Sequence, residues 1–313
     1  MLRKIVSTIL CGALLFSSKQ SVAQTKPAAD PKGRWDITLY ADGREIPSWL
    51  EIYHSGHKRL IGYFVGQSGS ARPVSIIHYD EGVLRFSIPP QWEAEDNDLQ
   101  FEARYAGDSL VGTLLEANGK KRDLIAHRAP LLKKTGEPKW SEAVSLFNNG
   151  KDLTGWKAMG QNQWIVENGV LKSPRSGANL VTTKKFTDFK LHIEFKCPAG
   201  SNSGVYLRGR YEVQIEDSYG KQPQKDLMGA IYGFLTPSEM AALPAGEWQT
   251  FDITLVGRMV TVIANGKMII CNQEIPGITG GALDSKEGEA GPLYIQGDRG
   301  PIEYRNITIQ EAI

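Results

Sequence analysis

The sequence predicts an all-β protein with two β domains, and three observations carry that prediction. Short segments in which apolar and polar residues alternate recur along most of the chain, as expected for half-buried strands. Turn-forming groups rich in Gly, Asp and Asn separate these segments at short, regular intervals. Segments with the 3.6-residue period of an amphipathic helix are nearly absent after residue 23. The 313 residues are enough for two domains, each with its own core.

Residues 1–23 are expected to form a secretory signal peptide. A basic start at Arg3 precedes an apolar run over residues 5–16, and small residues ending at Ala23 form the cleavage site. The apolar run is too short for a comfortable transmembrane helix. Cys11 follows Leu10, which is larger than the small residue that lipidation sites prefer before the cysteine, so no lipoprotein is predicted. The expected location is therefore periplasmic or secreted, with no integral membrane segment after cleavage.

The charge balance excludes an obvious electrostatic partner. The formal net charge is +1, with 36 basic and 35 acidic residues. Loss of the three basic residues of the leader leaves 33 basic residues, so the mature chain carries a charge of about −2. Such a balance gives no reason to expect nucleic acid or an anionic membrane as a partner.

Residues 24–128 are predicted to form a small antiparallel β-barrel or sandwich. Eight strands at short, regular spacing suggest a meander, whose topology resembles that of lipocalin-like barrels. The predicted strands are Trp35–Tyr40, Trp49–Tyr53, Arg59–Val65, Val74–Tyr79, Val83–Ile88, Asp98–Tyr105, Ser109–Leu115 and Lys121–His127. The histidines of this region lack metal-ligand spacing, apart from a loose pair at His54 and His57 in a turn. Trp92 lies in a loop without core periodicity, where it either packs under its own loop or stacks on a sugar or a partner domain.

Two prolines and several charges break the strand pattern over residues 129–140, which are predicted to be a linker. The β pattern resumes over residues 141–313. The strands expected there are Trp164–Glu167, Val170–Lys172, Phe189–Cys197, Gln249–Val256, Met259–Ala264, Lys267–Ile270, Pro292–Gln296 and Ile302–Ile309. A long irregular segment from Tyr219 to Pro244 is expected to be functional, because long loops in compact β domains usually are.

The segment Ser201–Tyr219 organises this second domain. It reads as one long strand or as two strands in tight succession, and its polar residues share one face. These polar residues are Tyr206, Arg208, Arg210, Glu212, Gln214 and Glu216. Such a face is either an ordinary solvated sheet surface or a polar surface that holds a polyhydroxylated ligand.

Seven segments in this order resemble the 3-keto-disaccharide hydrolase family, which has the concanavalin A-like lectin/glucanase jelly roll. The resemblance covers about residues 140–313. The segments are Leu146–Trp156, Trp164–Leu171, Ser201–Tyr219, Gly229–Gly233, Ala245–Trp248, Asn265–Lys267 and Pro292–Ile307. The resemblance implies a jelly-roll β-sandwich for the C-terminal domain.

The resemblance also implies a reaction on glycosides already oxidised to a ketone at C3. A base removes the acidified hydrogen from C2, and the C1 substituent leaves by β-elimination, with or without addition of water. The paired carboxylates that jelly-roll glucanases carry as Glu-x-Asp-x-x-Glu are absent, which disfavours an ordinary glycosidase. A non-catalytic glycan-binding protein on the same fold and an ordinary glycoside hydrolase remain the alternatives.

The predicted catalytic residues are Glu212, Asp217 and Arg208, with Glu212 the first choice for the base. A guanidinium beside Glu212 would keep it ionised. The residues predicted to bind the substrate are Asn202, Tyr206, Gln214, Tyr219, Tyr232, Gln296, Asp298 and Arg299. The family often has histidine where this chain has Arg299, so no metal site is predicted and a divalent cation stays open as a cofactor. Cys197 and Cys271 are expected on strands, either bridged or as two buried thiols.

Overall fold

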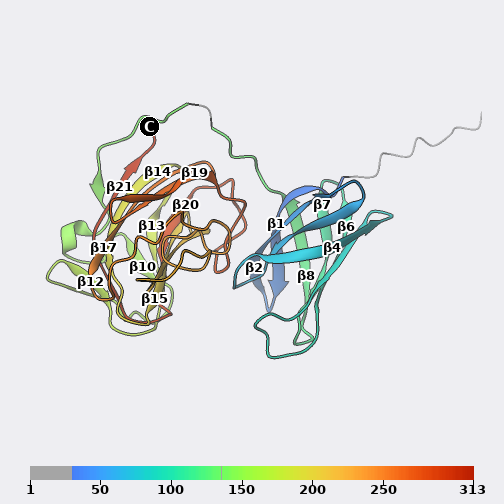
Figure 1. The fold of residues 1–313 in the computed structure, drawn as a ribbon, viewed down its shortest axis with the longest axis horizontal. Helices are drawn as coiled ribbons and strands as arrows, with labels where there is room; N and C mark the ends of the chain where they lie inside the picture. Colours follow the sequence, from blue (N-terminus) through green and yellow to red (C-terminus); the bar gives the residue numbers. More distant parts are fainter. Residues whose placement is uncertain (1–29, 135) are drawn as a thin grey trace, which may run out of the picture.

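The computed structural model describes residues 30–134 and 136–313 (Figure 1). The expected signal peptide lies outside the described residues. Within those residues the secondary structure consists of strands and one 3-10 helix, Asn148–Gly150, and no α-helix occurs. No helix in this part of the chain is long and apolar enough to cross a membrane. The prediction of an all-β fold is confirmed.

The first eight strands form a closed antiparallel barrel in which each strand pairs with the next and β8 pairs with β1. Closure leaves no unpaired edge strand. The strands are β1 (Gly33–Ala41), β2 (Arg44–Ser55), β3 (Arg59–Val65), β4 (Arg72–Asp80), β5 (Val83–Ile88), β6 (Leu99–Ala106), β7 (Ser109–Leu115) and β8 (Lys121–Arg128). Large apolar side chains fill the interior, and Phe86 stacks on Phe101 with ring centroids 4.6 Å apart. Of the two expected architectures, the structure shows the barrel.

The rest of the chain forms a jelly-roll sandwich of two antiparallel sheets. The five-stranded sheet has the order β10-β13-β20-β15-β16, and the larger sheet has the order β11-β12-β21-β14-β17-β18-β19, with β9 on β21. The strands are β9 (Val144–Ser145), β10 (Trp156–Ala158), β11 (Ile165–Glu167), β12 (Val170–Ser173), β13 (Leu180–Phe186), β14 (Phe189–Lys196), β15 (Asn202–Leu207), β16 (Tyr211–Glu216), β17 (Trp248–Val256), β18 (Met259–Ala264), β19 (Lys267–Glu274), β20 (Gly291–Ile295) and β21 (Ile302–Glu311). A continuous apolar core separates the sheets.

Three of these strands, β9, β10 and β13, are not among those that the alternation pattern indicated. β13 contains three consecutive exposed residues and a shift of register against β20, which explains its weak alternation. The segment Ser201–Tyr219 is two strands, β15 and β16, joined by a tight turn.

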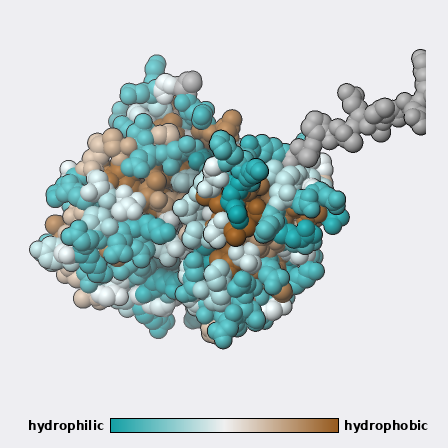
Figure 2. Space-filling model, turned by 45° about the vertical axis from the view of Figure 1, so that its right-hand side comes forward, coloured by the Kyte–Doolittle hydropathy of each residue, from teal (hydrophilic) through white to brown (hydrophobic). Residues whose placement is uncertain are grey.

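Figure 2 shows that the side of the molecule facing the viewer is mostly hydrophilic, with smaller hydrophobic patches.

Trp49 of β2 anchors the barrel on the sandwich. Its side chain is fully buried and belongs to the apolar core of the sandwich. The indole packs edge-on against Phe234, with ring centroids 5.3 Å apart. A Cβ atom on Gly277 would lie 2.2 Å from the indole nitrogen, so glycine is required there. The barrel and the sandwich are therefore joined by an apolar contact that leaves the two domains little freedom to move relative to each other.

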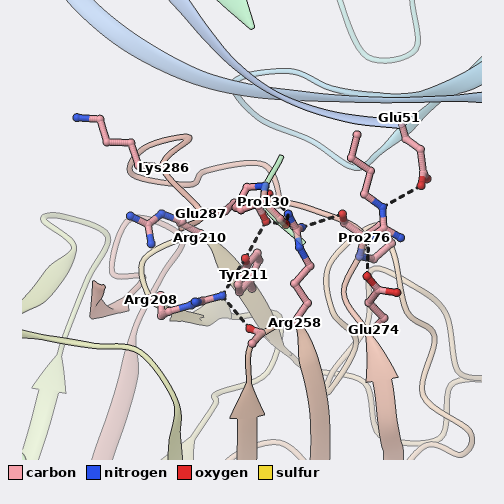
Figure 3. Close-up of polar contacts among 12 residues, drawn as sticks. Glu51, Pro130, Arg208, Arg210, Tyr211, Arg258, Glu274, Pro276, Lys286 and Glu287 are labelled. Carbon is pink, nitrogen blue, oxygen red and sulfur yellow. Dashed lines mark hydrogen bonds and ion pairs between the residues drawn. The ribbon is translucent and has the colours of Figure 1, made fainter. Parts of the chain in front are cut away.

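Polar contacts continue this junction, and Figure 3 shows them next to the barrel strands. The buried carboxylate of Glu287 accepts two hydrogen bonds from Arg258, each 2.6 Å long, and one from the Tyr211 hydroxyl at 2.7 Å. Arg34 of the barrel pairs with Glu274 of β19 at 2.6 Å. Removing one partner of a buried ion pair is strongly destabilising, because the other charge stays buried and unpaired.

The two cysteines are not bridged. Cys197 is buried just after β14, and burial raises the pKa of its thiol to about 12. Cys271 lies on β19 and is exposed. Both the expected alternatives, a disulfide and a pair of buried thiols, are therefore wrong.

The junction should make stability depend on pH through Asp36. Burial first, and then the neighbouring Glu287 carboxylate, raise the pKa of Asp36 to about 9. The unfolded chain releases this proton near pH 4, so the folded protein binds it more tightly across the interval from about pH 4 to about pH 9. The free energy of unfolding should therefore fall as pH rises through that interval, by at most about 1.4 kcal/mol per pH unit.

Asp36→Asn retains a donor toward Glu287 but has no proton to lose. We expect this variant to show a flatter pH dependence and to be more stable than the wild type at pH 9, as measured by urea unfolding from pH 5 to 9. The exposed Asp108→Asn is the matched control and should follow the wild type. Parallel pH curves for wild type and Asp36→Asn would contradict the assignment.

Candidate active site

The site is built on the hairpin of β15 and β16. Three residues, Arg208, Gly209 and Arg210, connect the strands. Arg208 and Gly209 have φ values of 52° and 67°, and the Arg210 N–H donates to the Leu207 carbonyl at 3.1 Å. Two successive positive φ values and this hydrogen bond are the features of a type I′ turn. The turn fixes the register, which places Tyr206 opposite Glu212.

Alternation along both strands then separates two faces. Val205 and Val213 pair on the face that packs into the sandwich core, while Tyr206, Glu212 and Gln214 line a pocket on the opposite face. Gly204, the third residue of β15, matters as well. Gly204 lies opposite Gln214, and a Cβ atom on it would lie 2.2 Å from Oε1 of Glu212. The Glu212 side chain therefore lies across the space that any larger residue at position 204 would fill.

The pocket has a volume of about 520 Å³, within the usual range for small-molecule sites. Five separate segments contribute: the hairpin, the loop after β16, the connection between β19 and β20, the end of β20 with the residues after it, and the connection between β3 and β4 of the barrel. The lining residues are Gln67, Ser68, Gly69, Asn202, Tyr206, Glu212, Gln214, Tyr232, Gly280, Gly281, Tyr294, Gln296, Asp298 and Arg299. Most of these side chains are polar.

Glu212 is the buried titratable group of this pocket. The pKa of its carboxyl is raised to about 8, mainly by burial and to a smaller extent by the nearby Asp298 carboxylate. A hydrogen bond with Tyr206 and the charge of Arg299 act in the opposite direction but do not compensate for burial. The expectation that a guanidinium keeps Glu212 ionised is therefore wrong, because no arginine of the hairpin faces it. A carboxyl with a pKa near neutrality can take up and release a proton during turnover.

Three tyrosines surround this carboxyl. Tyr206 stacks on Tyr294 with ring centroids 4.3 Å apart, and its hydroxyl donates to the Gly280 carbonyl at 3.0 Å. Tyr232 reaches the pocket because its N–H donates to the Glu212 carbonyl at 3.0 Å, which pairs the loop with the edge of β16. Burial raises the pKa of all three tyrosines, so they stay protonated at neutral pH and can donate a proton or a hydrogen bond.

Two amide oxygens in the pocket lack hydrogen-bond partners among the described residues. They are Oε1 of Gln214 and Oε1 of Gln296, and both are buried. An unpaired buried oxygen costs free energy, so such atoms commonly mark the position of a missing ligand or water. Amides both donate and accept, which suits the hydroxyl groups of a sugar.

Three of the predicted site residues do not line the pocket. Arg208 belongs to the turn, where it donates to the Tyr211 hydroxyl at 3.0 Å and to the Gly257 carbonyl at 2.9 Å. Asp217 accepts a hydrogen bond from the Gly200 N–H at 3.1 Å. Tyr219 is 60% exposed after the end of β16. The assumption of unbroken alternation failed for Arg208 because the chain reverses direction there.

The other predicted residues lie together in the pocket. They are Asn202, Tyr206, Glu212, Gln214, Tyr232, Gln296, Asp298 and Arg299. Asp298 and Arg299 are exposed at the rim, with Nε of Arg299 3.9 Å from Oδ1 of Asp298. Among the described residues, no group of three or more His, Cys, Asp or Glu side chains is arranged to hold a metal ion.

Sequence reasoning missed several lining residues. Tyr294 could have been found, because it lies two residues before Gln296 on a predicted strand and therefore on the same face. Gln67, Ser68 and Gly69 gave no signal, since their role depends on how the barrel docks. Trp92 is half-exposed and lies over Gly69, with the Arg72 guanidinium 4.8 Å from the ring centroid.

Fold and site together define a jelly-roll β-sandwich with a polar pocket around one buried carboxyl on its smaller sheet. Residues 142–310 match the model of the 3-keto-alpha-glucoside-1,2-lyase-like domain family. The chain belongs to this family, as its sequence resemblance predicted.

The chain is also similar to individual proteins. The chain is similar to a 3-keto-disaccharide hydrolase of Bacteroides thetaiotaomicron, with 29% identity over 122 residues. That match spans 35% of this chain and only 37% of the relative. A candidate glycosyl hydrolase of Parabacteroides distasonis is 34% identical, with a TM-score of 0.48 over 55% of this chain and 84% of the other. A second structure from that organism is 21% identical, with a TM-score of 0.44 over 55% of this chain and 94% of the other.

The space left by Gly204 gives a direct test of the geometry. Gly204→Ala should displace the Glu212 carboxyl, because the new Cβ would overlap Oε1. Since a shift of 1 Å can cost up to about a hundredfold in rate, we expect kcat/KM to fall at least about tenfold while the fold is kept. Gly288→Ala, whose nearest contact would be an ordinary 3.6 Å, is the control. Unchanged turnover of Gly204→Ala on the substrate proposed below would show that the position of this carboxyl is unimportant.

Proposed function

We propose that the protein is an exported enzyme that cleaves 3-keto-glycosides by proton abstraction at C2 and β-elimination, with or without rehydration. The observation that carries the proposal is the buried Glu212 carboxyl with its pKa of about 8. Membership of the 3-keto-alpha-glucoside-1,2-lyase-like family and the similarity to a 3-keto-disaccharide hydrolase support the substrate class. The charged start, apolar run and small-residue site of residues 1–23 support export.

The reaction begins when the Glu212 carboxylate removes the hydrogen on C2, which the ketone at C3 has acidified. The electron pair of the C2–H bond moves to the C3 oxygen and forms an enolate. Collapse of the enolate restores the ketone, forms a C1–C2 double bond and breaks the bond from C1 to the leaving oxygen. The leaving oxygen takes a proton from a donor in the pocket. Addition of water across the double bond makes the net reaction a hydrolysis.

The pocket offers a group for each of these tasks. The positive charge of Arg299 can stabilise the enolate oxygen. The hydroxyl of Tyr206, which keeps its proton at neutral pH, can protonate the leaving oxygen. The unpaired oxygens of Gln214 and Gln296 can accept hydrogen bonds from the sugar hydroxyls. The buried setting of Tyr206, Gln214 and Gln296 strengthens their interactions, whereas Arg299 acts from the exposed rim.

Replacement of the base tests the proposal. Glu212→Gln retains the volume and most of the hydrogen bonds, and we expect turnover of a 3-keto-glucoside to fall at least about a hundredfold. The thermal midpoint should be no lower than that of the wild type, because the buried ionisable group is gone. Glu247→Gln, an exposed change on the sandwich, is the matched control.

The assay compares a chromogenic glucoside with its 3-keto derivative. Release from the keto form alone supports elimination. Release from the unoxidised glucoside would favour an ordinary glycoside hydrolase, and binding without release from either would favour a glycan-binding protein.

The pH dependence of the reaction should report the same carboxyl. Since the base must be ionised, kcat/KM should rise with pH through an apparent pKa of about 8. Asp298→Asn should move this rise in kcat/KM to lower pH, because the Asp298 carboxylate raises the pKa of Glu212. The check is a pH–rate profile from pH 5 to 10 for both proteins. If kcat/KM rises at the same pH in the variant as in the wild type, the titrating group is not Glu212.

A further inference from the structure

The connection between β3 and β4 of the barrel enters the pocket from outside the family domain. Gln67, Ser68 and Gly69 line the pocket, whereas the family match covers only residues 142–310. The side chains of Gln67 and Ser68 are exposed, and neither makes a hydrogen bond to another described residue. Both side chains can donate and accept hydrogen bonds. They are therefore free to bind a hydroxylated ligand.

Backbone contacts hold this connection on the sandwich. The Gly281 N–H donates to the Gln67 carbonyl at 3.0 Å. A Cβ atom on Gly280 would lie 2.3 Å from the Gly69 carbonyl oxygen, so the two backbones are in direct contact. On the other side, the indole of Trp92 covers Gly69. The connection is thus clamped between Trp92 and the sandwich, and it presents a preformed wall to a ligand.

This wall and Arg299 lie toward opposite ends of the pocket. Arg299 belongs to the segment whose Gly300 packs against Ser201, directly before β15 begins. The barrel residues pack on Gly280, which accepts the hydrogen bond from Tyr206 near the other end of β15. Tyr206 lies four positions after Asn202, which corresponds to about 13 Å along an extended strand.

The chemistry of the proposed reaction orients the substrate between these ends. C1 and C3 are the two ring neighbours of C2, so the leaving group and the keto oxygen lie on opposite sides of the hydrogen that Glu212 removes. If the keto oxygen faces Arg299, the leaving group faces Tyr206 and the barrel. We propose that Gln67 and Ser68 form the subsite for the leaving group and that they select a hydroxylated one, such as a second sugar. This inference rests on the proposed function.

The test compares two substrates that differ only in the leaving group: the 3-keto derivatives of methyl glucoside and of a glucosyl disaccharide with the same anomeric configuration. The variant is Gln67→Ala/Ser68→Ala. The control is Ser87→Ala/Gln100→Ala, which removes the same two side-chain types from an exposed cross-strand pair elsewhere on the barrel. Loss of two hydrogen bonds should lower kcat/KM for the disaccharide about tenfold. The value for the methyl glucoside should change less than about twofold, and the control should match the wild type.

An equal loss on both substrates would place the two residues against the keto ring and overturn the inference, as would no loss on either. If the wild type cleaves neither substrate, the proposed function fails, and the subsite is judged by binding instead. Calorimetric titration with the unoxidised disaccharide and with methyl glucoside then serves as the measurement. Weaker binding of the disaccharide alone to Gln67→Ala/Ser68→Ala supports the subsite. Equal changes for both ligands, or no binding of the disaccharide to the wild type, overturn it.

Discussion

The close contact between Glu212 and the α-carbon of Gly204 is the constraint on which the site depends. The hairpin register fixes which residues face the pocket, but it does not by itself make room for a long acidic side chain on a packed sheet. Glycine at position 204 supplies that room, because the carboxyl occupies the space that a Cβ atom there would need. In this position the carboxyl is removed from water, and removal from water is the main cause of its raised pKa.

The same device, a missing side chain where two segments meet, joins the barrel to the sandwich. Gly277 accommodates the indole of Trp49, and Gly280 lies against the backbone of Gly69. Gly233 follows Tyr232 in the loop beside β16, and a Cβ atom there would lie 2.8 Å from the Ala71 nitrogen. These contacts connect the position of the barrel to the two segments that carry Tyr232 and Gly280 into the pocket. The way in which the barrel docks on the sandwich therefore determines part of the shape of the site.

Particular residues show how much of the site could be predicted from the sequence. Period-two alternation was sufficient to place Tyr206, Glu212 and Gln214 on one face, because each lies well inside a regular strand. It failed for Arg208, since a three-residue connection that begins with two positive φ values replaces the strand at that point. The contribution of Gln67 could not be predicted from any local pattern, because it arises from contacts between segments more than 200 residues apart. The raised pKa of Glu212 was missed for a related reason: burial depends on the tertiary structure, whereas charged neighbours are visible in the sequence.

The buried carboxyl also has an energetic consequence. In the unfolded chain Glu212 is ionised at neutral pH, while in the folded protein its pKa of about 8 keeps most of it protonated. A raised pKa favours the folded state at low pH and costs stability as pH rises toward 8, and at pH 7 this cost is on the order of 3 kcal/mol. That is a substantial fraction of the stability of an ordinary domain. The large apolar core between the two sheets and the burial of Trp49 at the junction offset it. That a group costs this much and contributes no structural contact that glutamine could not replace supports the proposal that Glu212 is kept for its chemistry.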